Sequence, residues 1–242
     1  MKWYKRNYWT ATGKVFDIGI ATRNALYKIQ NGVKPELAGG RDVFDNGNGS
    51  LMRISPLLFY IFNKSIHEGF EIIKNVSSIT HAHIRSIVSC FYYLEFMLQL
   101  LNGNDKIIAY NNLKKIVPEY LNKINIDQLD IDLFKKLLLL NIFEFSEEDI
   151  ESSGYVLHTL EASIWCFLTT SSYQEAVIKA INLGNDTDTT GCVTGGIAGL
   201  YYGFNDIPEK WIKKILKYDD ILDLSERLYN KVKNYKYINI IV

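Results

Sequence analysis

The stretch HIRSIVSCFYYLEFMLQLL, residues 83–101, sets the fold class of this 242-residue chain. Its apolar side chains recur at steps of three and four residues, which predicts one amphipathic helix that ends at the following Asn-Gly pair. Similar steps occur in most of the chain, whereas strand-like alternation is confined to YINIIV, residues 237–242. We therefore expect an all-α protein, with further helices at 18–29, 55–64, 111–121, 132–140, 173–183 and 208–218.

Composition indicates one compact domain that spans residues 1–242. The chain is 48% apolar and 22% charged, which is typical of a globular protein with a sizeable core. It contains no Pro/Ser-rich linker and no internal repeat that would divide it. Basic and acidic residues both number 27, so the formal net charge is zero and no bulk field recruits nucleic acid or an anionic membrane. We expect neither as a partner.

The cysteines and the chain start favour a cytoplasmic location. Cys90, Cys166 and Cys192 are far apart in apolar surroundings, with neither zinc-like spacing nor an even count. Buried free thiols in a reducing compartment account for them. No apolar run approaches the roughly 20 residues of a membrane-spanning helix, and the opening MKWYKRNYW lacks the apolar middle of a secretory signal.

An acidic turn opens the stretch GNDTDTTGCVTGG, residues 184–196. Asp186 and Asp188 alternate with hydroxyl side chains just before a predicted helix. One Asp at a helix start is usually an N-cap, but two close carboxylates repel each other unless a proton or a cation lies between them. Mg²⁺ takes carboxylate and hydroxyl oxygens together with water. The spacing alone leaves both interpretations open.

The helix predicted after this turn carries glycine at every fourth position, at Gly191, Gly195, Gly199 and Gly203. Each interior glycine costs about 1 kcal/mol relative to alanine. The missing side chains allow a neighbour to pack close to the helix backbone, and that packing can offset the cost. That neighbour is either another helix or a ligand.

Four segments in their order along the chain resemble the ADP-ribosylglycohydrolase family. Residues 153–203, from SGYVLHTLEAS to GLYYG, are similar to its C-terminal signature, and TGKVFDIGIATRNAL (12–26), DNGNGSLMRISPL (45–57) and SSITHAHIRSIVSC (77–90) to its middle motifs. The resemblance covers nearly the whole chain. It implies a compact all-α domain with two Mg²⁺ ions at the base of a cleft, which hydrolyses the bond between ADP-ribose and a protein side chain or small conjugate.

The resemblance also implies site residues. Asp186 and Asp188 match catalytic metal ligands, and Thr189 matches a third ligand. The NGNG loop matches a substrate-binding loop whose backbone N–H groups can approach a diphosphate. The implied substrate-binding residues are Asn46, Gly47, Asn48, Gly49, Ser50, Met52, His81 and Tyr155. Arg53 either continues this loop or serves as a structural ion-pair partner.

One part of the family pattern has no match. Members begin with a helix and a Thr-Asp-Asp motif that supplies the remaining metal ligands, and no such triplet occurs in this sequence. We therefore expect a chain that is N-terminally truncated relative to the family and contributes at most a partial two-metal site. It is a fragment of an enzyme, it is completed by a second chain, or it is an inactive relative that binds ADP-ribose or only keeps the fold.

The expected truncation has a consequence for packing. Removal of an N-terminal helix uncovers an apolar face, which favours self-association. The sequence does not distinguish arginine, serine or another residue as the linkage cleaved.

Overall fold

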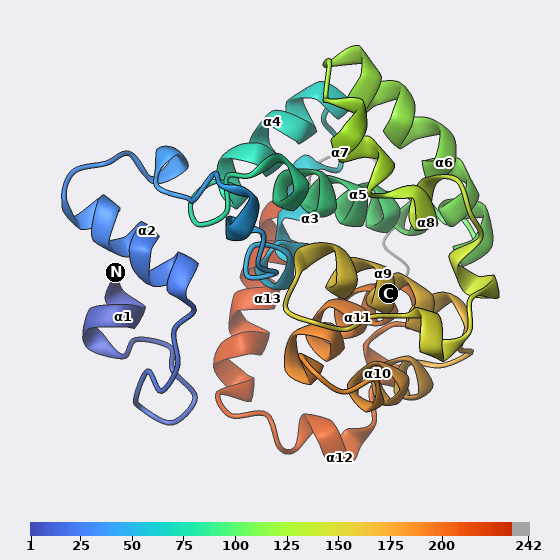
Figure 1. Ribbon diagram of the computed structural model, residues 1–242. Helices are drawn as coiled ribbons and strands as arrows, with labels where there is room; N and C mark the ends of the chain where they lie inside the picture. Colours follow the sequence, from blue (N-terminus) through green and yellow to red (C-terminus); the bar gives the residue numbers. More distant parts are fainter. Residues whose placement is uncertain (234–242) are drawn as a thin grey trace.

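The computed structural model describes residues 1–233 and confirms an all-α fold (Figure 1). Within these residues there are thirteen α-helices, seven short 3₁₀ helices and no strands. The expected strand-like run at 237–242 lies outside the described residues. Two isolated β-bridges, between Gly40 and His81 and between Gly47 and Tyr155, tie loops together.

The helices fall into long core elements and short connecting ones. The α-helices are α1 Lys2–Arg6, α2 Ile20–Gln30, α3 Leu58–Ile61, α4 Ile66–Ser77, α5 Ile84–Leu101, α6 Lys106–Lys123, α7 Gln128–Asp132, α8 Lys135–Leu138, α9 Val156–Leu168, α10 Tyr173–Asn182, α11 Thr187–Tyr202, α12 Glu209–Ile212 and α13 Tyr218–Val232. The 3₁₀ helices are η1 Pro35–Leu37, η2 Val43–Asp45, η3 Leu51–Arg53, η4 Ser55–Leu57, η5 Ile142–Glu144, η6 Glu147–Asp149 and η7 Phe204–Asp206.

Helices α5 and α9 form the centre of the core. Every residue of α5 from Ser86 to Met97 is buried, and so is every residue of α9 except His158. Helix α5 is long and apolar enough to cross a membrane, contrary to the sequence expectation, but 72% of it is buried inside the protein, as in the core helix of a globular domain. The helix predicted from residues 83–101 is thus confirmed, and it ends at Asn102 as expected.

Helix α11 packs its glycine stripe against α10. A Cβ atom added to Gly191 would lie 2.9 Å from Ile181 Cγ2, and one added to Gly195 would lie 3.3 Å from Tyr173 Oη. Ile181 and Tyr173 both belong to α10. The neighbour admitted by these glycines is therefore another helix, which resolves the alternative left open by the sequence.

Two predicted helices are interrupted. The periodicity over 208–218 predicts one helix, but α12 has only four residues and α13 begins at Tyr218, after Lys217 with a left-handed φ of 59°. The segment 132–140 likewise divides, because α7 ends at Asp132 and α8 covers only Lys135–Leu138. In both segments the apolar spacing continues across a point where one helix ends and the next has not yet begun.

The two ends of the described chain contribute little to the core. In Figure 1, α1 and α2 (blue) lie to one side of the bundle. Helix α13 follows the bundle with its side chains exposed along nearly its whole length, and Val232 is its one buried residue. Exposed apolar residues of these ends include Phe16, Ile20, Ile221 and Leu224.

Candidate functional site

Three segments distant in sequence meet at the start of α11. They are the NGNG loop (residues 46–50), the segment 152–155 before α9, and the acidic turn (residues 184–189). Backbone hydrogen bonds join them: Asn48 N–H donates to the Gly154 carbonyl (3.1 Å), and Asp186 N–H donates to the Ser152 carbonyl (3.1 Å). A third bond, from Val156 N–H to the carbonyl of Asn46 (2.9 Å), fixes the loop against the first turn of α9.

Asp186 occupies the N-cap position of α11, but its side chain forms no capping hydrogen bond. Its backbone carbonyl instead accepts from both Thr190 N–H (3.1 Å) and Thr190 Oγ1 (2.8 Å). The carboxylate oxygen Oδ2 accepts from Asn48 Nδ2 at 2.7 Å. The Asp186 side chain therefore faces the NGNG loop.

The charges of the acidic turn suit a hard cation. Burial alone would raise the pKa of the Asp186 carboxyl, but the hydrogen bond from Asn48, together with Thr189 and Asp188, lowers that pKa below its ordinary value. Asp188 is exposed and Thr189 is buried. Two carboxylates and a hydroxyl are the oxygen donors that Mg²⁺ prefers, so the residues fit this ion as part of a coordination sphere.

The same turn does not form a complete metal centre by itself. Among residues 1–233, no cluster of three or more His, Cys, Asp or Glu side chains could hold a metal ion. Mg²⁺ is usually held by one or two carboxylates, with water and substrate oxygens as the other ligands. The acidic turn supplies that number of carboxylates and no more.

His81 lies beneath the NGNG loop and supports it. Its side chain is buried, and a Cβ atom added to Gly49 would lie 2.9 Å from its Cε1 atom. Its Nδ1 atom is 2.7 Å from Thr80 Oγ1. Burial and the guanidinium of Arg53 lower the pKa of His81 to about 4, so the ring is neutral at neutral pH. Glycine at position 49 lets the loop rest directly on this ring.

Other expected site residues of this loop hold it in place. Asn46 Nδ2 donates to the Val43 carbonyl at 2.8 Å, and Asn46 Oδ1 accepts from Ser86 Oγ at 3.1 Å. The fully buried Ser50 lies 3.6 Å from Cys90 Sγ. In contrast, the backbone N–H groups of Gly47 and Gly49 find no acceptor among the described residues. These two groups remain available for an anionic ligand.

Arg53 bonds to backbone and forms no ion pair among residues 1–233. Its Nη1 atom donates to the Gly49 carbonyl (2.6 Å), and its Nη2 atom donates to the Val76 carbonyl (3.1 Å). The guanidinium thus joins the NGNG loop to the last turn of α4. Neither carbonyl carries a charge, so the ion-pair role considered from the sequence does not hold.

Met52 and Tyr155 line the outer part of the same region. The Met52 side chain is half exposed, and its carbonyl lies 3.5 Å from Cys192 Sγ of α11. Cys192 is exposed, which corrects the expectation that all three cysteines are buried. Tyr155 is partly buried before α9, and its ring meets the ring of His158 edge-on at a centroid distance of 5.0 Å.

Thr159 was not expected from the sequence as a site residue, yet it touches this network. It is fully buried on α9, and its Oγ1 atom accepts from Asn48 Nδ2 at 2.8 Å. The residue lies within the segment 153–203 that resembles the family signature. No spacing rule, however, connects position 159 to position 48.

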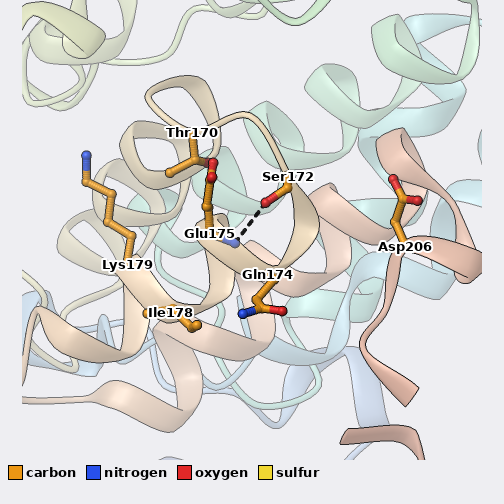
Figure 2. A pocket seen from close by; sticks show the side chains of 7 residues that line it. All are labelled: Thr170, Ser172, Gln174, Glu175, Ile178, Lys179 and Asp206. Atoms are coloured by element: carbon orange, nitrogen blue, oxygen red, sulfur yellow. Dashed lines mark hydrogen bonds between the residues drawn. The ribbon is translucent and has the colours of Figure 1, made fainter. Parts of the chain in front are cut away.

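A pocket lies elsewhere, away from the acidic turn. It encloses about 740 Å³ between the end of α9, the start of α10 and η7, and Figure 2 shows its lining residues. They are Thr170, Ser172, Gln174, Glu175, Ile178, Lys179 and Asp206, none of which is an expected site residue. None of these residues belongs to the NGNG loop or to the acidic turn.

Comparison with known proteins matches this arrangement to one family. The ADP-ribosylglycohydrolase family model matches residues 1–237. A solved structure described as an ADP-ribosylglycohydrolase-related protein complex superposes with a TM-score of 0.72 and 27% identity, and the match covers 88% of this chain and 69% of that one.

Curated relatives carry related descriptions. The ADP-ribosylarginine hydrolase Tri1 of Serratia proteamaculans is 32% identical over 95% of this chain. The ADP-ribosyl-[dinitrogen reductase] glycohydrolase of Rhodospirillum rubrum is 25% identical over 71% of this chain. The match spans 58% of the Serratia protein and 51% of the Rhodospirillum protein, so this chain corresponds to little more than half of each.

Proposed function

The chain belongs to the ADP-ribosylglycohydrolase family, and from this premise we propose that it hydrolyses the glycosidic bond between ADP-ribose and an arginine side chain of a modified protein. The arginine linkage follows the descriptions of the Serratia and Pseudomonas putida relatives, both named ADP-ribosylarginine hydrolases. The observation that carries the proposal is the contact between the acidic turn and the NGNG loop through Asn48 and Asp186.

Different residues of this chain suit different parts of ADP-ribose. The unbonded N–H groups of Gly47 and Gly49 suit the diphosphate of ADP-ribose, since backbone N–H groups bind anions well. The half-exposed Met52 and the partly buried Tyr155 provide apolar surface next to them. The lowered pKa keeps Asp186 ionised at neutral pH, so its negative charge is available beside a ribose that develops positive charge as the bond breaks.

We further propose that the reaction depends on Mg²⁺. Asp186, Asp188 and Thr189 would hold the ion. When bound, Mg²⁺ supplies positive charge that orients and polarises oxygen groups of the substrate. The family resemblance implies two ions, and we propose that this chain contributes at most part of their site.

Release of ADP-ribose from an arginine-modified protein tests the function. We expect release with Mg²⁺, none with a chelator, and a loss of roughly 100-fold or more in Asp186→Asn and Asp188→Asn, because each change removes a charge from the acidic turn. Asp206→Asn, an exposed change at the other pocket, is the matched control and should keep full activity. Undiminished release in both turn variants would refute the site, and a serine-modified substrate cleaved in preference would refute the linkage.

A second candidate is an ADP-ribose-binding or structural relative without turnover. The lack of a third acidic, His or Cys ligand near Asp186 and Asp188 within residues 1–233 favours it. Calorimetric titration with ADP-ribose distinguishes the two. Binding without hydrolysis at any Mg²⁺ concentration would establish the second candidate.

We also propose self-association, through α13 in place of the N-terminal face expected from the sequence, and a cytoplasmic location. The exposed apolar side chains of α13 support the first, because a contiguous apolar face on a soluble protein usually marks an interaction surface. Three free cysteines support the second, since reducing compartments keep thiols unpaired. The partner we propose for the site itself is an ADP-ribosylated protein, with neither nucleic acid nor membrane involved.

A further inference from the structure

Asn48 is the contact through which the NGNG loop reaches the acidic turn. Its side chain is 8% exposed, and its Nδ2 group donates to Asp186 Oδ2 (2.7 Å) and to Thr159 Oγ1 (2.8 Å). A side-chain amide has two N–H donors, so both are used. The Asn48 nitrogen therefore faces protein on both sides and has no donor left for a ligand.

The hydrogen-bond pattern around Asn48 permits only one orientation of its amide. Thr159 Oγ1 donates its single proton to the Ser153 carbonyl at 3.2 Å, so toward Asn48 it can only accept. A flipped amide would place Asn48 Oδ1 against this oxygen and against the Asp186 carboxylate. Asn48 Oδ1 and the Asp186 carboxylate, both acceptors, would then face each other without a proton. These hydrogen bonds thus fix the orientation of the Asn48 amide, and the Asn48 amide in turn holds the Asp186 carboxylate.

We propose that Asn48 is a positioning residue which, held by Thr159, fixes the orientation in which the Asp186 carboxylate meets a divalent cation. The inference rests on the proposed function, because that function places a cation at Asp186. It differs from the role that the family resemblance implies for Asn48. In this role Asn48 acts through Asp186, by way of its side-chain nitrogen.

The proposal can be tested by cation affinity, without reference to activity. Hydrogen-bond partners of metal-ligating carboxylates contribute about 10- to 100-fold to metal affinity. We therefore expect Asn48→Ala to weaken Mn²⁺ binding to the whole chain by about that factor, as measured by electron paramagnetic resonance of free Mn²⁺. Mn²⁺ serves as the probe because it is paramagnetic and accepts the same oxygen ligands as Mg²⁺.

Position 159 offers a matched pair of variants. Thr159→Val keeps the shape of the side chain and removes the hydroxyl that holds Asn48, whereas Thr159→Ser retains the hydroxyl. We expect weaker Mn²⁺ binding in Thr159→Val and affinity close to that of the unmodified chain in Thr159→Ser. Circular dichroism melting curves identify any variant that fails to fold, and the near-isosteric Thr159→Val keeps the test available if Asn48→Ala does not fold.

The outcomes separate this inference from the proposed function. Equal Mn²⁺ affinity in the unmodified chain, Asn48→Ala and Thr159→Val would overturn the inference and leave the function standing. Equal losses in Thr159→Ser and Thr159→Val would show a packing effect and overturn the part assigned to Thr159. If the unmodified chain does not bind Mn²⁺, the magnesium dependence fails, and the inference fails with it.

Discussion

Glu95 is a buried carboxyl in the middle of α5, a different helix from the one that begins at the acidic turn. It is 8% exposed, and within residues 1–233 it forms no ion pair. Burial raises the pKa of Glu95 to about 7. The folded protein therefore keeps a proton on Glu95 between about pH 4.5 and 7, where the unfolded chain has already lost it.

This shift predicts a stability that declines as the pH rises. The contribution of Glu95 is fully present below about pH 4.5 and is lost through pH 7, at a cost of about 3 kcal/mol above that range. Glu95→Gln removes the titrating group, so we expect the variant to exceed the unmodified chain in free energy of unfolding at pH 8 by up to that amount and by little at pH 5. Urea denaturation at the two pH values measures the difference.

An exposed carboxyl provides the comparison. Glu119 lies on the surface of α6, and Glu119→Gln serves as the control for loss of a carboxyl from the protein surface. A Glu95→Gln protein that loses the same stability from pH 5 to pH 8 as the unmodified chain would show that another group causes the decline.

At the scale of elements, α11 shows that the glycines of one helix are not equivalent. A Cβ atom added to Gly196 would lie 2.6 Å from Tyr93 Oη, which is buried and donates to the Val193 carbonyl at 3.0 Å. A Cβ atom added to Gly199 would lie 3.6 Å from Tyr173 Cε2, an ordinary contact. The first position has no room for a methyl group, and the second has enough.

Two alanine variants should therefore have opposite effects. Gly196→Ala crowds a packed core and should lower the free energy of unfolding by about 1–3 kcal/mol. Gly199→Ala gains helix propensity without a clash and should raise that free energy by about 0.5–1 kcal/mol. Urea denaturation of both variants gives the comparison. A stabilised Gly196→Ala protein would contradict the contact with Tyr93.

The same elements show how far the sequence leads. Regular apolar spacing correctly predicts α5 and α10, and the glycine-rich pattern after the acidic turn correctly predicts α11, because each is a continuous helix. Spacing cannot reveal the left-handed residue Lys217, which separates α12 from α13, since the apolar pattern continues across it. Helix α13, which begins at Tyr218, lies beyond the last helix that the spacing predicts.

The sequence predicts several residues of the candidate site, but it does not predict the contacts between them. Asp186 and the NGNG loop stand out in the sequence, but the bond between Asn48 and Asp186 joins positions 138 residues apart. The support of the loop by His81 and the part of Thr159 depend in the same way on how helices pack. A linear pattern carries no information about such pairs.

At the scale of the whole molecule, α13 is an amphipathic helix without a cover among the described residues. Its apolar stripe follows three- and four-residue steps, and Ile221 and Leu228 within it are 41% and 36% exposed. The first half of the helix is acidic and the second half, with the residue that follows, is basic: Asp219, Asp220, Asp223 and Glu226 precede Arg227, Lys231 and Lys233. An antiparallel pair of α13 helices from two copies would bury both stripes and place opposite charges together.

This surface predicts a weak dimer. Fifteen residues span only about 22 Å, so we expect association in the micromolar range of protein concentration. Leu228→Glu places a charge on the stripe and should abolish dimers in sedimentation experiments. Leu139→Glu changes a leucine of similar chemistry that is 72% exposed elsewhere, and it should leave the dimer intact. A protein that stays monomeric at all concentrations would rule out this pairing.

The NGNG loop also lies where three helices begin. It contacts Ser86 in the first turn of α5, Val156 in the first turn of α9 and Asp186 at the start of α11. Each helix start carries roughly half a positive charge from its aligned peptide dipoles. The three helix starts thus add positive potential at the NGNG loop, beside the negative Asp186 and the positive Arg53, and this contribution depends on backbone direction alone.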